Sequence, residues 1–232
     1  MDHKLSENFR GVRIFSSEKA DGPMNFRLGG KERVEQFIKS HNFFVPSVSC
    51  EQVHGNEIVF AKEPGHFAKT DAALCRDNFA VITRSADCLP LMIFDKKSGI
   101  IGAAHVSRKN LSDSIIKNFS KMHQENGGDV GSTAVFLGPH IRKQNYKINK
   151  EGVSILQKGL FGKFLDKEGF FDLTEAVIFA LENEGFLREN IEDCKIDTFT
   201  TDSLYSYRRD ALHSQVNVFA TVIIKDSKND KV

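Results

Sequence analysis

The feature of this sequence that most constrains its fold is a succession of three short apolar runs near the middle of the chain. The runs cover residues 79–83, 90–94 and 99–104, and residues 95–99 between the last two read Asp-Lys-Lys-Ser-Gly. Apolar runs of this length are typical of buried strands, and a connection of this composition is typical of a hairpin turn. The centre of the chain is therefore predicted to be rich in β-structure.

Strand-like and helix-like segments are mixed on either side of this centre. Further strands are predicted at residues 12–15, 57–60, 134–137 and 216–224. Helices, in which apolar residues recur every three or four positions, are predicted at residues 31–41, 111–124 and 173–184. Because strands and helices do not alternate strictly, an α+β fold is favoured over a doubly wound parallel sheet. The sequence contains no internal repeat and no long linker, which predicts one domain spanning residues 1–232.

Length and charge limit the kinds of partner that this chain is expected to bind. With 232 residues the chain is long enough to bury a substantial core. The net charge of +1 creates no field that favours nucleic acid or an anionic membrane. No apolar run approaches the roughly 20 residues that a membrane helix needs, and residues 1–7 lack the apolar segment of a signal peptide. Four scattered cysteines without a C-x-x-C pair are typical of a reducing compartment, so we expect a cytoplasmic protein.

Three short stretches end strand-like runs with residues that are capable of chemistry, and they read QVHG, ADCLP and AAH. They contribute His54, Cys88 and His105. One thiolate and two imidazoles suit zinc and leave a fourth position for water or substrate. Asp87 or Gln52 would then orient that water or one of the imidazoles. The spacing by itself also fits a second interpretation, in which the histidines are structural core residues and Cys88 is a small buried side chain.

Six motifs occur along the chain in a fixed order. They are Gln52–Gly55, Thr70–Ala72, Ala86–Pro90, Ala103–His105, Gly138–Ile141 and Tyr207–Asp210. In this order they resemble the laccase-domain family, also called YfiH-like or multicopper polyphenol oxidoreductase proteins. The resemblance covers roughly residues 10–225 and implies central mixed β-sheets, stacked like a sandwich and flanked by helices.

The resemblance also implies a site and a range of activities. Carried over to this chain, the zinc ligands of the family are His54, Cys88 and His105. The activities associated with the family are phosphorolysis of purine nucleosides, phosphorolysis of methylthioadenosine and deamination of adenosine. The expected partners are therefore a purine nucleoside and phosphate, with zinc rather than copper as the metal. Some bacterial members are instead described as hydrolases that edit peptidoglycan.

The chain departs from the family pattern directly after His105. The family continues A-G-W-R-G, whereas residues 106–110 here read Val-Ser-Arg-Lys-Asn. Lys109 takes the expected Arg position and Arg108 the expected Trp position. A lysine supplies charge but not the planar fork that binds phosphate with two hydrogen bonds. Arg108 is therefore expected to compensate, with Arg208 and Arg209 as further candidate anion ligands.

Other functions fit parts of the same pattern. Cys88 and His105 suit a metal-free thiol nucleophile and its base, although this leaves His54 without a role. Copper oxidation needs more histidine ligands than His54 and His105. Four other histidines are expected at the surface or in loops: His66, His123, His140 and His213. His140, next to Gly138 and Pro139, is also a candidate to line the cleft. The altered loop after His105 also fits a member that binds nucleosides without turning them over. An amidase acting on peptidoglycan precursors is the remaining alternative.

Overall fold

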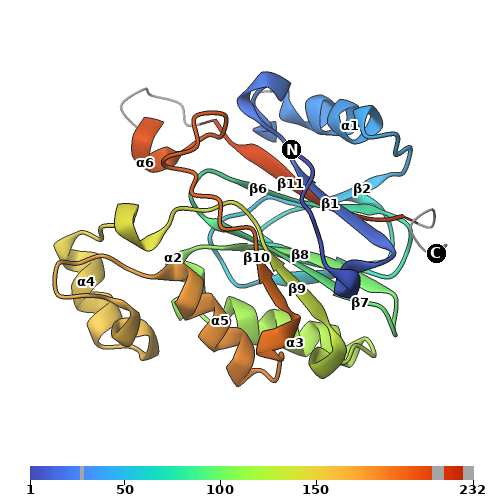
Figure 1. The fold of residues 1–232 in the computed structure, drawn as a ribbon. Coiled ribbons are helices and arrows are strands. Elements are labelled where there is room, and N and C mark those ends of the chain that lie inside the picture. The colour runs from blue at the N-terminus through green and yellow to red at the C-terminus, as the bar shows by residue number, and fades with distance from the viewer. Residues whose placement is uncertain (27–28, 211–216, 227–232) are drawn as a thin grey trace.

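In the computed structural model, which describes residues 1–26, 29–210 and 217–226, two β-sheets stack between layers of helices (Figure 1). The first sheet contains, in spatial order, β1 (Val12–Ser16), β11 (Phe219–Lys225), β6 (Ala80–Ser85), β2 (Ser47–Cys50) and β4 (Gly65–Phe67). Strand β11 runs antiparallel to β1 and β6, whereas β2 runs parallel to β6 and β4.

The second sheet holds the predicted β-rich centre. It contains, in spatial order, β10 (Ile191–Asp193), β9 (Ala134–Leu137), β7 (Leu89–Asp95), β8 (Ile100–Val106), β5 (Ala72–Cys75) and β3 (Ile58–Ala61). Strands β7 and β8 form an antiparallel hairpin around residues 95–99, as the sequence predicts. Parallel pairs at both edges, β3 with β5 and β9 with β10, make this sheet mixed as well.

Alternation along β7 explains why its sequence is apolar from Leu89 to Phe94. Met92 and Phe94 face the first sheet, and Leu91 and Ile93 face the helices on the other side. Successive side chains of a strand point to opposite faces, so a strand covered on both faces needs apolar residues throughout. The first sheet is covered on its outer face by α1 (Gly30–Ser40), through side chains such as Val34, Phe37 and Ile38.

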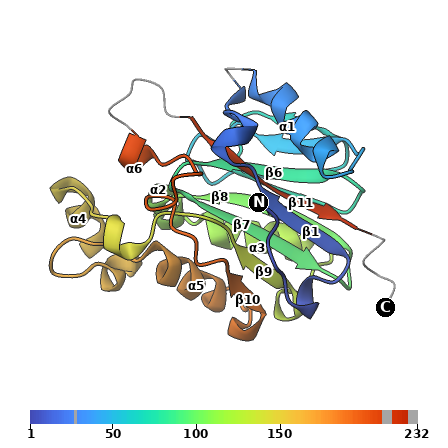
Figure 2. The same cartoon turned by 45° about the horizontal axis from the view of Figure 1, so that its top comes forward.

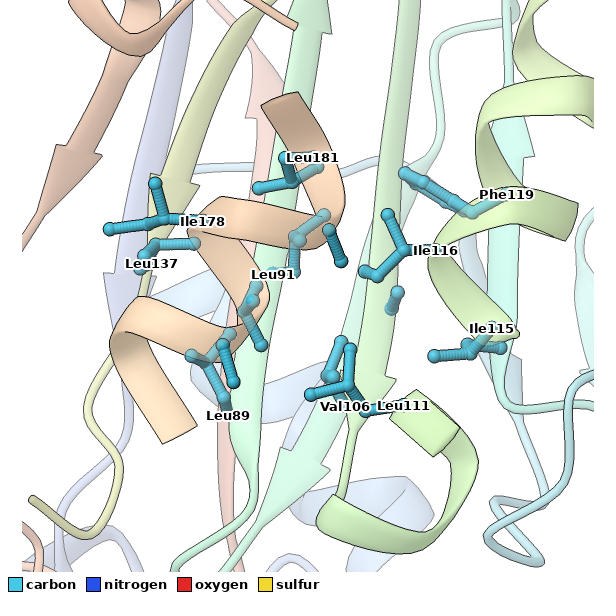
Figure 3. Close-up of a cluster of buried hydrophobic side chains, with 14 of the residues drawn as sticks. Leu89, Leu91, Val106, Leu111, Ile115, Ile116, Phe119, Leu137, Ile178 and Leu181 are labelled. Atoms are coloured by element: carbon cyan, nitrogen blue, oxygen red, sulfur yellow. The ribbon is translucent and has the colours of Figure 1, made fainter. Parts of the chain in front are cut away.

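Helices α3 (Ile115–Glu125) and α5 (Leu173–Asn183) cover the outer face of the second sheet. Figure 3 shows Ile116 and Phe119 of α3 and Ile178 and Leu181 of α5 pointing toward this sheet. Two mixed sheets flanked by helices confirm the predicted fold class. No helix among the described residues is long and apolar enough to cross a membrane.

The predicted helix at residues 111–124 is wrong in one respect, because the chain forms two helices there. Helix α2 (Arg108–Ser112) ends before Ser114, whose φ of 72° breaks the helical path before α3 begins. Other elements are too short to give a periodic pattern, and the sequence did not predict them: β2, β4, β5, β10, α4 (Lys150–Gln157) and α6 (Tyr207–Asp210). The predicted strand at 216–224 appears as β11, and residue 216 lies outside the described part of the chain.

Helices α2, α4 and α6 gather at one end of the sandwich (Figure 2). Strand β8 runs into this end, because α2 begins two residues after the strand stops. Cys88, which precedes β7, and His105, near the end of β8, lie at this end.

Candidate metal centre

His54, Cys88 and His105 meet at the crossings between the two sheets. His54 lies on the connection from β2 to β3 and Cys88 on the connection from β6 to β7, so both segments pass from the first sheet to the second. His105 is the second-last residue of β8. One donor atom from each of the three lies within 4.8 Å of the others, and among the described residues this is the one group of three or more candidate ligands.

The three donors are arranged for a small ion. The Sγ atom of Cys88 lies 4.0 Å from Nε2 of His54, and the two imidazole rings meet edge to face at 4.8 Å between centroids. Tetrahedral zinc, with bonds of about 2.0–2.3 Å, separates such donors by about 3.6 Å. The donor set and its spacing therefore fit zinc with small movements of the exposed His54.

Asp71 is a functional residue that the sequence interpretation did not assign. It lies just before β5 and is 1% exposed. Its carboxylate accepts hydrogen bonds from Nδ1 of His105 at 2.9 Å and from the backbone N–H groups of Val53, His54 and Gly55 at 2.8–3.0 Å. One carboxylate thus fixes the QVHG segment and leaves Nε2 of His105 for a metal. The T-D-A motif was the signal for this residue.

Charge and burial compete at Cys88 and His105. Burial alone would raise the pKa of the Cys88 thiol, but the charge of His105 and hydrogen bonds from both histidines outweigh burial and lower the pKa to about 6. Burial likewise disfavours the His105 imidazolium, but Cys88 and Asp71 outweigh it and raise the pKa of His105 to about 9. Without a metal, the pair is therefore a thiolate beside an imidazolium, and the thiolate is the form that binds zinc.

Two backbone positions of the site adopt left-handed conformations that non-glycine residues rarely take. Gln52 has φ 65° and His54 has φ 59°. The side-chain amide of Gln52 donates to the carbonyl of Arg84 at 2.6 Å and accepts from its N–H at 2.9 Å. Such strained conformations persist only where surrounding bonds hold them. In the structure, both polar groups of the Gln52 side chain are engaged in holding the loop of His54 against β6.

Asp87 also has a left-handed backbone, with φ 90°, and it is not part of the group of candidate ligands. It accepts from Oγ1 of Thr198 and from the backbone N–H of Arg208, both at 2.6 Å. Burial raises the pKa of this carboxyl group, and these hydrogen bonds oppose the rise. The structure therefore places Asp87 as the anchor of the segment that leads into α6.

The four predicted cationic residues differ in what they face. Arg108 is half-buried and hydrogen-bonded to Tyr146, and the guanidinium of Arg208 lies 5.8 Å from the centre of the same ring. Burial raises the pKa of Tyr146 to about 12, and the charge of Cys88 adds to the rise, so this tyrosine lies beside the metal ligands. Tyr146 is a second residue that the sequence interpretation did not assign. Lys109, in contrast, is exposed.

Arg209 is held differently from its neighbour Arg208. Its guanidinium donates to the backbone carbonyls of Thr198, Phe199, Thr201 and Leu204. It also pairs with the carboxylate of Asp210 at 2.8 Å. Because its donors are engaged with its own loop, Arg209 shapes the loop, and we do not count it among the anion ligands.

Two histidines expected at the surface or in loops are buried. His123 approaches Asp95 at 3.3 Å, and His140 bonds to the carbonyl of Gly138 at 2.7 Å and to the hydroxyl of Thr174 at 2.8 Å. Both side chains are buried and hydrogen-bonded in the structure, and the pattern of apolar residues in the sequence does not indicate this burial. His66 is exposed at the surface, as expected, and His213 lies outside the described residues.

A pocket of about 350 Å³ opens onto the metal ligands. Besides the three candidate ligands, its walls include Phe26, His66 and Arg84. This volume lies at the small end of the range for sites that bind small molecules, which is roughly 300–1,000 Å³.

The fold and the site together define a protein with two stacked mixed β-sheets flanked by helices and a candidate His–Cys–His metal centre where the sheets connect. A sequence profile of the family described as multi-copper polyphenol oxidoreductase laccase matches residues 31–224. The chain belongs to this family, and the resemblance inferred from its motifs is confirmed.

Relatives in bacteria carry the name purine nucleoside phosphorylase. The protein Cj1217c of Campylobacter jejuni is 33% identical over 166 residues, which cover 70% of this chain and 71% of that protein. The protein CA_C1699 of Clostridium acetobutylicum is 27% identical over 214 residues and 89% of each chain.

Two solved structures are similar in fold. YlmD of Geobacillus stearothermophilus superposes with a TM-score of 0.82 at 19% identity, covering 96% of this chain and 94% of that one. YfiH of Bacillus licheniformis gives a TM-score of 0.82 at 17% identity, covering 96% of both chains. At these identities the likeness supports the fold.

Proposed function

We propose that this protein is a metal-dependent enzyme that cleaves purine nucleosides with phosphate. The observation that carries the proposal is that Cys88 lies between the candidate metal ligands and a cluster of two arginines around Tyr146. On one side the thiol lies with His54 and His105, and on the other it lies near Tyr146, which Arg108 and Arg208 flank. A metal donor set beside paired guanidinium groups suits a reaction in which an anion is one of the substrates. The names of the bacterial relatives support the same class of reaction.

Zinc is the metal that we assign to His54, Cys88 and His105. Zinc accepts one thiolate and two imidazoles readily, and three protein ligands leave one position open. When bound, it supplies a Lewis acid that polarises a substrate oxygen or nitrogen. Copper, which the family name implies, is the rival for the same ligands. Metal analysis of the purified protein decides between the two.

Arg108 and Arg208 are the residues that we assign to phosphate. A guanidinium presents two parallel N–H donors to a phosphate, which an ammonium does not. Arg108 is half-buried against Tyr146, whereas Lys109 is exposed, so Arg108 takes over the task that the family pattern gives to the next position. In the reaction, an oxygen of phosphate forms a bond to C1′ of the ribose while the C1′–N9 bond breaks. The base leaves with that electron pair and is protonated.

Deamination of adenosine is the second reaction that we propose for this site. Here water adds at C6 of the purine, and the amino group leaves as ammonia. The two reactions share the metal ligands, but only phosphorolysis needs Arg108 and Arg208. The requirement for phosphate therefore separates them.

A chromatographic assay tests both reactions. Purified protein of known metal content is incubated with adenosine, with and without phosphate, and adenine, inosine and hypoxanthine are measured. Adenine that appears only with phosphate supports phosphorolysis, and inosine without phosphate supports deamination. If neither product appears from protein that contains metal, the proposal fails in favour of the amidase or of a nucleoside-binding protein without turnover.

One observation favours a different enzyme built on the same residues. The lowered pKa of Cys88 beside His105 is what a thiol nucleophile with its base requires. A chelator distinguishes the two mechanisms. Loss of turnover on metal removal, restored by zinc, excludes the thiol nucleophile, whereas activity that persists in metal-free protein and is lost in Cys88→Ala supports it.

A further inference from the structure

The pocket over the metal ligands has a wall that the proposed chemistry does not use. Phe26, His66 and Arg84 line this wall together, although they come from three separate segments. The Cζ atom of Arg84 lies 4.2 Å from the centre of the Phe26 ring. The rings of Phe26 and His66 are 4.9 Å apart between centroids and inclined at 50°. Two aromatic rings and a planar cation therefore share one side of the pocket.

The guanidinium of Arg84 is fixed by bonds at one edge. Its Nη2 donates to the carbonyls of Cys50 at 2.7 Å and Glu51 at 3.2 Å. Both polar groups of Gln52 clamp the backbone of the same arginine. Because the side chain and its backbone are both held, the plane of the guanidinium is set before a ligand arrives, and little conformational freedom is lost on binding.

The wall suits a flat ring better than an anion. The Cζ atom of Arg84 lies over the ring of Phe26, and Nη2 of the same guanidinium is engaged with backbone carbonyls, so the side chain presents little of the free fork that binds carboxylate or phosphate. Planar guanidinium groups and aromatic rings stack on the faces of heterocyclic bases. His66 is held by the hydroxyl of Ser49 at 3.0 Å.

We propose that Phe26, His66 and Arg84 form a base subsite, in which the heterocycle of the substrate stacks on this wall while the sugar extends toward His54 and Cys88. The identity of the ring as a purine rests on the proposed function, but the preference for a planar aromatic ring does not. Stacking reads the face of a ring and not its exocyclic groups. The subsite is therefore expected to hold 6-amino and 6-oxo purines alike.

The neighbouring groove supplies a matched control. It shares Phe26 and His66 with the pocket and also contains Phe44, which is 78% exposed and does not line the metal pocket. Phe26→Ala and Phe44→Ala remove the same ring, one inside the proposed subsite and one outside it. Arg84→Lys is the second informative variant, because it keeps the charge and removes the planar group.

The experiment is calorimetric titration of hypoxanthine and of adenine into the metal-containing protein. Phe26→Ala is expected to weaken binding of both bases about tenfold or more, and Phe44→Ala to leave binding unchanged. Metal content and thermal melting are measured for each variant. If Phe26→Ala melts early or loses metal, Arg84→Lys decides by the same comparison. Wild-type affinity in the folded variants, or no binding of either base to the wild-type protein, overturns the subsite.

Failure of the subsite and failure of the proposed function give different results. If bases bind through Phe26 but no nucleoside is cleaved with phosphate, the subsite stands and phosphorolysis falls. If nucleosides are cleaved and Phe26→Ala leaves KM for the nucleoside unchanged, phosphorolysis stands and the subsite falls.

Discussion

Replacing Asp71 by Asn tests whether the metal centre depends on one buried carboxylate. In the wild-type protein, Oδ1 accepts from His54 N and His105 Nδ1, and Oδ2 accepts from Val53 N and Gly55 N. An amide of the same shape has one acceptor oxygen and presents two N–H donors on its other side. Whichever way the amide turns, its N–H groups face two of the four atoms that donate to the carboxylate in the wild-type protein.

The two orientations have different consequences for the site. With its oxygen toward Val53 and Gly55, the amide donates to Nδ1 of His105, and the imidazole must carry its proton on Nε2, the atom needed by the metal. With the opposite orientation, the QVHG segment loses two backbone bonds. Loss of such a partner costs about 10–100-fold in metal affinity. Each donor left without its acceptor costs about 1–3 kcal/mol. One donor, His54 N, loses its acceptor in the first orientation and two do in the other, so the free energy of unfolding should fall by about 1–6 kcal/mol.

Metal affinity is measured by competition with a chromophoric chelator, and stability by urea unfolding of the metal-free protein. Asp95→Asn is the matched control, because Asp95 is also buried, accepts several backbone N–H groups and approaches a histidine, His123. It should destabilise the fold without changing metal affinity. Wild-type affinity in Asp71→Asn, or an equal loss of affinity in Asp95→Asn, refutes the role of Asp71 as the residue that orients His105.

In metal-free protein, iodoacetamide should modify Cys88 at a rate that rises through about pH 6 and levels off by about pH 8, because the thiolate is the reactive form and its pKa is lowered to about 6. Mass spectrometry should find the other three cysteines unmodified at pH 7, because burial raises their pKa values. A modification rate that still increases at pH 9 would contradict a thiolate at Cys88. Arg108→Lys should raise KM for phosphate about tenfold while Lys109→Ala changes it less than about twofold, and the reverse order in steady-state kinetics would reassign the anion site. Ser114→Gly should stabilise the protein by about 0.5–1 kcal/mol in urea unfolding, because glycine adopts φ 72° without the cost of a Cβ and the Ser114 side chain makes no capping bond. A lower urea concentration at half-unfolding would show that the break between α2 and α3 depends on serine.

The parts of the fold that the sequence predicts are those with a strong local pattern. Strand β7 is apolar from Leu89 to Phe94 because both faces are covered, and α5 carries a long apolar stripe. The split between α2 and α3 is not predicted, because the apolar spacing continues across it and only the conformation of Ser114 interrupts the helix. Short parallel pairs such as β9 with β10 depend on contacts between distant segments and leave no periodic signal.

The site is predictable to a similar extent. Residue type suggests His54, Cys88 and His105, and the family motifs single them out, but chain position cannot show which carboxylate touches them. Asp71 and Asp87 look equivalent in sequence, since each follows a small or polar residue within a motif. In the structure the first holds His105, and the second holds Thr198 and the start of α6. Only the packing of the sheets makes this distinction.

The position of the candidate ligands on connections between the sheets would give a bound metal a structural role as well as a chemical one. Because His54 and Cys88 lie on two of the connections that pass between the sheets, an ion shared with His105 would fasten both of these connections to β8. Such an ion would cross-link the two connections at one end of the sandwich, and its binding free energy would add to the stability of the native state. Amide hydrogen exchange should show this directly, since removal of the ion should raise exchange at both connections together while the opposite end of the sandwich stays protected. A cell that limits its supply of the metal would thereby set the lifetime of the protein as well as its activity.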